Sequence, residues 1–98
     1  MTHKEYLLVH LIEECSEIQK AASKALRFGL EDCNPNTSNR NNAEDIAIEL
    51  IDMLTIRDML LHNNAIPTLN EEDLKEQKRK RINEYIKISE KLGCINVD

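Results

Sequence analysis

The sequence predicts an all-α protein with three main helices, and three observations support this fold class. Apolar residues recur at intervals of three and four positions over long stretches, which is typical of amphipathic helices. The chain of 98 residues holds only two glycines and two prolines. No stretch shows the alternation of apolar and polar residues that marks a β-strand. Because one short chain buries little surface, we expect a four-helix-bundle-like core formed by homo-oligomerisation into a dimer or tetramer.

Residues that favour helix ends set the expected boundaries. Threonine and asparagine favour N-caps, and glycine favours the position after a helix. We therefore expect helices over about 2–28 and about 42–62, and a third that ends at about residue 92, with a polar loop at 30–41. The candidate N-caps are Thr2, then Asn41 or Asn42, then Thr68 or Asn70, and the candidate C-terminal stops are Gly29 and Gly93. Together, residues 1–98 are expected to form a single domain.

Composition excludes several classes of partner. The net charge of −5 argues against broad binding of nucleic acids or of acidic membranes. The three cysteines show no C-x-x-C spacing, which fits a reducing compartment. The N-terminus lacks a signal-peptide pattern, and no apolar run approaches the length of a membrane span. We expect a cytoplasmic protein with no nucleic-acid and no membrane partner.

Two clusters of carboxylates lie where helical periodicity favours apolar residues. In the first helix, Glu14 interrupts an apolar stripe and Glu17 lies at the edge of that stripe. The stripe consists of Leu7, Leu11, Ile18, Ala21 and Ala25. In the second helix, Asp45, Glu49 and Asp52 form an acidic strip apart from the other polar residues, with nothing basic within it. Burial of unpaired carboxylates is costly, so this placement indicates a compensating cation.

The types of ligand indicate which cation this is. Glu14 and Glu17 are three positions apart, and so are Glu49 and Asp52, so each pair presents two oxygens on adjacent helical turns. Antiparallel packing of the two helices could bring all four carboxylates together. The residue three positions after Glu17 is Lys20, rather than the histidine of di-iron bundles. An all-oxygen site favours Mg²⁺, or else Mn²⁺, over Zn²⁺ or Fe²⁺.

Such a centre predicts phosphate chemistry, because protein-bound Mg²⁺ is commonly shared between carboxylates and substrate phosphates. Gly29 and Gly93 are the only glycines, so the chain has no P-loop, and basic side chains must contact the phosphates. The candidates are Lys20, Lys24 and Arg27 in the first helix and Lys78 and Arg81 in the third. The basic run at 78–81 also fits a solvated helix face, and both interpretations stay open.

The motifs Glu13-Glu14-x-x-Glu17 and Glu49-x-x-Asp52 resemble the signature of the MazG-like all-α nucleoside triphosphate pyrophosphohydrolases, in particular small phage-encoded members. The resemblance covers roughly residues 5–62. It implies an intertwined dimer, or a tetramer built from such dimers. It also implies Mg²⁺-dependent cleavage of a nucleoside triphosphate between the α- and β-phosphates, which releases a nucleoside monophosphate and pyrophosphate.

The resemblance also implies roles for individual residues. Glu14, Glu17, Glu49 and Asp52 would be the metal ligands, and Glu13 would be a supporting carboxylate or would orient the attacking water. Thirty-one residues separate Glu17 from Glu49, an interval longer than is usual in the family. The excess falls in the loop at 30–41, which would then help to form a base pocket. The candidates for stacking on the base are Phe28 and Tyr85.

Two alternatives from other functional classes stay open. The first is a non-catalytic helical oligomerisation or regulatory module, whose carboxylates pair with lysine or arginine across a dimer. The second is a small nucleic-acid-binding protein that uses the third helix. The acidic net charge and the different directions of the basic side chains around that helix argue against the second alternative.

Overall fold

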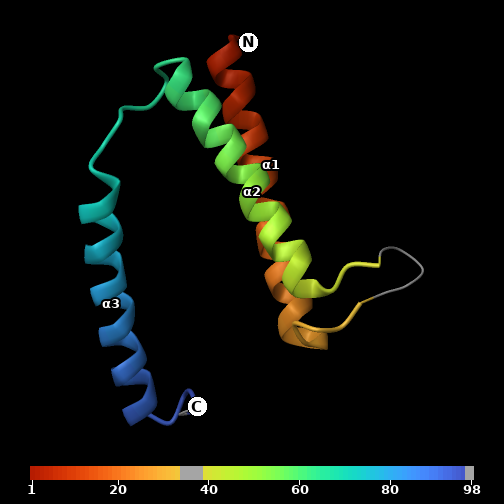
Figure 1. Ribbon diagram of the computed structural model, residues 1–98, viewed down its shortest axis with the longest axis vertical. Helices are drawn as coiled ribbons and strands as arrows, with labels where there is room; N and C mark the ends of the chain where they lie inside the picture. The colour runs from red at the N-terminus through yellow and green to blue at the C-terminus, as the bar shows by residue number, and fades with distance from the viewer. Residues whose placement is uncertain (34–38, 97–98) are drawn as a thin grey trace. The chain divides into compact units, whose positions relative to one another are not determined.

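The computed structural model of the chain consists of three helices joined by two connections (Figure 1). The helices are α1 (His3–Phe28), α2 (Asn42–His62) and α3 (Glu71–Lys91). The structure describes residues 1–33 and 39–96, and within these ranges it contains no β-strand, only an isolated antiparallel bridge between Cys33 and Asn41. The predicted all-α class and the three helices are therefore confirmed.

The helix ends follow the capping residues in the sequence. Thr2 is the N-cap of α1, as expected. Asn41 is the N-cap of α2 and forms a capping box, in which its side chain accepts from the Glu44 N–H at 2.8 Å and the Glu44 carboxylate accepts from the Asn41 N–H at 3.2 Å. Asn70, rather than Thr68, is the N-cap of α3. Of the two caps considered for α3, the asparagine is the one used.

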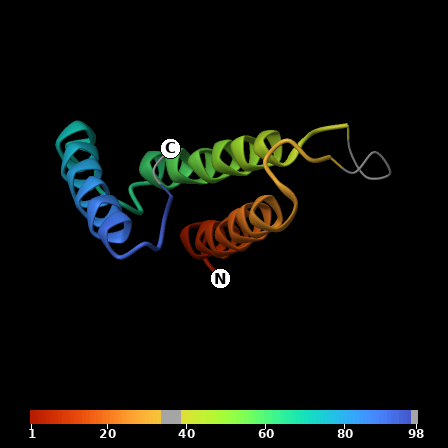
Figure 2. The same cartoon turned by 90° about the horizontal axis from the view of Figure 1, so that it is seen from below.

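The chain divides into two compact units, Met1–Pro67 and Thr68–Asp98. The first unit contains α1 and α2, which pack side by side as a helical hairpin in both views (Figures 1 and 2). The second unit contains α3. The expectation of a single domain over 1–98 stays a prediction.

The α1 stripe faces α2, as the periodicity predicts. Leu7 and Ala25 are buried at its two ends. The residues between them, Leu11, Glu14, Ile18 and Ala21, are half-buried. On α2, Leu60 is the most buried apolar side chain, with 1% of its surface exposed. Glu14 is thus part of the packed face, which is the property that singled it out in the sequence.

Asn42 ties the end of α1 to the start of α2. Its side chain is 2% exposed, and its Nδ2 donates to the Gly29 carbonyl at 2.8 Å. Gly29 adopts a φ of 97°, a conformation that favours glycine. The Asn42 N–H also donates to the Asp32 carbonyl at 2.9 Å, and the Ala43 N–H donates to the Leu30 carbonyl at 2.8 Å. These bonds set how far α2 is shifted along α1, and therefore which side chains of the two helices meet.

The hairpin buries little apolar surface. Among the described residues, only Leu7, Ala25 and Leu60 are buried apolar side chains. Helix α2 carries an exposed apolar row, which we call the outer row. The outer row consists of Ala43, Ala47, Leu50 and Leu54, all of which are exposed. Within one chain, α2 is therefore far from fully buried.

The second unit is also poor in buried residues. No residue of α3 is buried, although apolar side chains such as Leu74, Ile82 and Tyr85 lie along it, between 44% and 66% exposed. Large exposed apolar patches are frequent at surfaces that contact other molecules. Within the part of the chain that the structure describes, no helix combines the length and the apolar character that crossing a membrane requires.

Candidate metal centre

Three carboxylates from two helices meet at the middle of the hairpin. Glu14 comes from α1, and Glu49 and Asp52 come from adjacent turns of α2. One oxygen from each of the three lies within 4.8 Å of the other two. We call this group the carboxylate centre. Its members are three of the four residues that the sequence motifs single out as metal ligands.

One oxygen of the Glu14 carboxylate, Oε2, is buried without a hydrogen-bond partner among the described residues. An unpaired buried carboxylate oxygen is destabilising by about 1–3 kcal/mol or more, so such an atom in a folded protein requires an explanation. A bound cation would supply the missing partner. The donor set is made of oxygen alone, which fits Mg²⁺ or Mn²⁺.

The electrostatic environment of Glu49 also favours a bound cation. Partial burial removes water from this carboxylate and is the largest cause that raises its pKa above the ordinary value of 4.5. The negative charges of Asp52, Glu14, Glu17 and Asp45, in decreasing order, raise the pKa further. Five acidic residues thus act on one another at the middle of the hairpin. A divalent cation would relieve this repulsion.

The raised pKa of Glu49 predicts how the stability of the metal-free protein depends on pH. Because the pKa is higher in the folded than in the unfolded chain, the folded protein binds more protons between the two values. The free energy of unfolding should therefore fall as the pH rises from the ordinary value of 4.5 through the folded value. Thermal unfolding from about pH 4 to about pH 8, with EDTA and with Mg²⁺, measures this dependence.

The control for this prediction is Glu49→Gln, which removes the titrating group with little change in shape. With EDTA, the unfolding temperature of this variant should fall less with rising pH than that of the wild type. With Mg²⁺, the wild type should gain more stability at neutral than at acidic pH, since the ion binds the ionised form. Equal pH dependence of the two proteins in EDTA would contradict the prediction.

Glu17 and Glu13 lie beside the carboxylate centre. Glu17 is exposed and lines a pocket together with Glu49, and its negative charge contributes to the raised pKa of Glu49. Glu13 is 62% exposed, and its Oε2 lies 3.6 Å from Nδ1 of His10. Neither the Glu17 nor the Glu13 carboxylate therefore belongs to the group formed by Glu14, Glu49 and Asp52. Their roles as a fourth ligand and as a supporting carboxylate stay predictions.

A pocket of about 260 Å³ adjoins the carboxylate centre on the side of the α1–α2 connection. Glu49 belongs to both, and Glu17 and Asp45 also line the pocket. Four basic side chains complete its wall, and we call it the basic pocket. They are Lys20, Lys24, Arg27 and Arg40. The three basic residues that follow the acidic motif in α1 therefore lie where phosphates bound beside the carboxylates could reach them.

Arg40 is a residue that the sequence analysis missed. Its Nε lies 3.0 Å from Oδ1 of Asp45, whose side chain is 26% exposed. The acidic strip of α2 contains no basic residue of its own, and this ion pair comes from the segment before the helix. Arg40 precedes the Asn41 N-cap, and Asp45 is the fourth helical residue. These are the two positions that contact each other in a hydrophobic staple, so capping rules contained a signal for this pair.

Lys78 and Arg81 are exposed on α3, which belongs to the second unit. Their proposed contact with phosphates stays a prediction. The loop at 30–41 was expected to help form a base pocket, and its residues 34–38 lie outside the described part of the chain.

Comparison of the chain with protein-family models, with curated proteins and with solved structures finds no match. Functional interpretation therefore depends on two kinds of observation. The first is the geometry of the carboxylate centre and the basic pocket. The second is the resemblance of the two acidic motifs to a family signature.

Proposed function

We propose that this protein is a Mg²⁺-dependent nucleoside triphosphate pyrophosphohydrolase. It cleaves a nucleoside or deoxynucleoside triphosphate between the α- and β-phosphates and releases the monophosphate and pyrophosphate. The observation that carries the proposal is the buried, unpaired Oε2 of Glu14, which lies in a group of three carboxylates next to a pocket with four basic side chains. An anionic substrate bridged to carboxylates by a hard cation accounts for both features.

In this proposal the carboxylates bind the metal and the basic residues bind the phosphates. Glu14, Glu49 and Asp52 hold the metal, with Glu17 as a further ligand from the next turn of α1. Bound there, Mg²⁺ would neutralise phosphate oxygens and lower the pKa of a coordinated water. Lys20, Lys24, Arg27 and Arg40 bind the departing pyrophosphate and balance its charge. Glu13 would support the carboxylate centre, and Lys78 and Arg81 stay candidates for contacts with the phosphates.

The proposal includes a homodimer or homotetramer in the cytoplasm. Support comes from the exposed outer row of α2 and from the absence of any buried residue in α3. Helices with exposed apolar rows become stable when they pack against further helices, and a second copy of α1 and α2 would complete a four-helix bundle. In this assembly the enzyme would control a nucleotide pool or remove non-standard nucleotides.

One observation favours the alternative of a non-catalytic oligomerisation or regulatory module. The Arg40–Asp45 ion pair shows that a basic side chain can neutralise a member of the acidic strip without any metal. If lysine or arginine residues of a partner paired with Glu14, Glu49 and Asp52 in the same way, the carboxylates would be structural. Such a protein would neither bind Mg²⁺ tightly nor turn over nucleotides.

Incubation of the purified protein with a panel of nucleoside and deoxynucleoside triphosphates separates the two functions. The proposed enzyme should release monophosphate and pyrophosphate from at least one of them with Mg²⁺ and from none with EDTA. Separation of the products by anion-exchange chromatography distinguishes pyrophosphate from orthophosphate. Release of orthophosphate and a nucleoside diphosphate would show cleavage between the β- and γ-phosphates instead. No turnover of any nucleotide with Mg²⁺ or Mn²⁺ would favour the non-catalytic module.

A further inference from the structure

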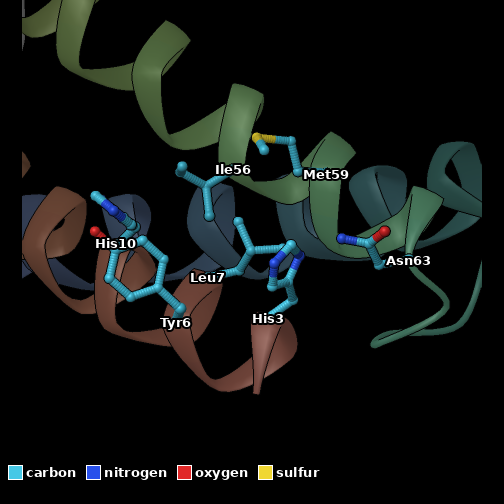
Figure 3. A pocket seen from close by; sticks show the side chains of 7 residues that line it. All are labelled: His3, Tyr6, Leu7, His10, Ile56, Met59 and Asn63. Carbon is cyan, nitrogen blue, oxygen red and sulfur yellow. The ribbon is translucent and has the colours of Figure 1, made fainter. Parts of the chain in front are cut away.

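A second cavity lies on the other side of the carboxylate centre. It measures about 410 Å³, within the range of about 300–1,000 Å³ that is common for small-molecule sites. Leu7 points from α1 toward Ile56 and Met59 of α2 (Figure 3). Polar atoms come from His3, Tyr6, His10 and Asn63, and no lysine or arginine lines the cavity. We call it the apolar cavity.

The apolar cavity, the carboxylate centre and the basic pocket follow one another along the facing sides of α1 and α2. On α1, His10 lines the cavity and Glu14 follows four residues later, with Lys24 beyond it. On α2, Ile56 lines the cavity and Asp52 lies four residues before it. Four residues span about 6 Å along a helix, so the apolar cavity and the carboxylate centre are about one turn apart. Because α1 and α2 run in opposite directions, the three zones follow one another in the same spatial order on both helices.

We propose that the apolar cavity binds the base and sugar of the nucleotide, so that the triphosphate extends from there across the carboxylate centre into the basic pocket. The inference rests on the proposed function and adds to it the direction in which the substrate lies. Charge decides this direction. The β- and γ-phosphates carry most of the negative charge, and Lys20, Lys24, Arg27 and Arg40 all line the same end. The base and sugar are uncharged and match the end without lysine or arginine.

Tyr6 and its neighbours offer the contacts that a nucleobase needs. The Tyr6 ring packs against the His10 ring with centroids 4.8 Å apart and planes at 85°. This arrangement holds the orientation of both rings, while Tyr6 stays 57% exposed and open to a ligand. Bases stack on aromatic faces, and the Asn63 amide can both donate to and accept from the edge of a base. Met59, 46% exposed, adds a polarisable side chain to the same cavity.

The opposite direction would place the base near Phe28, at the far end of α1. Phe28 is as exposed as Tyr6, at 57%. Its ring lies 5.2 Å from the Arg27 guanidinium carbon, so this aromatic side chain already has a cationic partner. In that direction the triphosphate would lie in a cavity without a lysine or arginine, and the four basic residues would face an uncharged group. Phe28 and Tyr6 therefore form a matched pair for a test.

The experiment measures kcat/KM for the best nucleotide of the panel, and the inhibition constant of inorganic tripolyphosphate as a probe without base or sugar. Loss of one stacking contact is worth about tenfold or more in nucleotide binding, so Tyr6→Ala should raise KM by about that factor. Met59→Trp, which fills the cavity, should do the same. Neither variant should change inhibition by tripolyphosphate. Phe28→Ala should alter nucleotide and tripolyphosphate affinities equally, through Arg27, or leave both unchanged.

Each outcome bears on one proposal. A selective loss of nucleotide affinity in Phe28→Ala, with Tyr6→Ala and Met59→Trp unchanged, would overturn the inferred direction. So would unchanged nucleotide affinity in all three variants. In both cases the wild type still hydrolyses nucleotides, and the proposed function stands. Absence of turnover by the wild type would overturn both proposals together. Circular dichroism and thermal unfolding verify that the variants are folded.

Discussion

Replacement of Asp52 by asparagine should lower kcat/KM for the best nucleotide by about 100-fold or more, while the metal-free protein becomes more stable. Activity falls because asparagine keeps the volume of aspartate but removes a charged oxygen from the carboxylate centre. Stability rises because, after burial, the charge of Asp52 is the largest cause that raises the pKa of Glu49. Steady-state kinetics and thermal unfolding in EDTA measure these two effects, and calorimetric titration measures the affinity for Mg²⁺.

Because activity falls while stability rises, this result is distinguishable from a loss of folding. A variant that fails to fold loses both activity and stability, whereas removal of one charge from a repulsive cluster loses activity alone. Asp58→Asn is the matched control, because Asp58 lies on the same helix, is 65% exposed and pairs with Arg57 at 3.1 Å. Its activity should stay near that of the wild type. Unchanged Mg²⁺ affinity in Asp52→Asn would contradict the proposed centre.

Replacement of Leu54 by lysine should dissociate the proposed assembly. Leu54 belongs to the outer row of α2 and is 41% exposed within one chain. If a second copy covers this row, the lysine ammonium would be buried without a partner, which is destabilising by about 3 kcal/mol or more per chain. Size-exclusion chromatography with light scattering should show a shift to monomer. The unfolding temperature should also fall and lose its dependence on protein concentration.

Thr55→Lys is the control for this prediction. Thr55 is the next residue, is exposed, and donates from its hydroxyl to the Ile51 carbonyl at 2.9 Å. It lies about 100° around the helix from Leu54, on the side of the polar residues Asp58 and His62, so the same new charge should leave the assembly intact. A wild-type protein that is monomeric at all concentrations would contradict the proposed oligomer. Equal dissociation by both variants would indicate an effect of charge alone and would exclude the outer row as the interface.

Much of the fold follows from local patterns that the sequence displays directly. The α1 stripe from Leu7 to Ala25 is the face that packs on α2, and Thr2 and Asn41 cap the first two helices as expected. These features depend on residues within a few positions of one another, where backbone geometry leaves few choices. For the same reason, Glu14 could be recognised as a carboxylate on a packed face before its surroundings were known.

The sequence by itself thus determined the three helices, their caps and the two acidic motifs. Only the tertiary structure decided that the oxygens of Glu14, Glu49 and Asp52 meet while Glu17 lies at the edge, and that Arg40 joins the basic pocket. These contacts depend on how far α2 is shifted along α1, and hydrogen bonds from Asn42 to Gly29 and Asp32 hold that shift. Helical periodicity gives the face on which a residue lies, but the residue that it meets across the interface depends on packing between two separate helices.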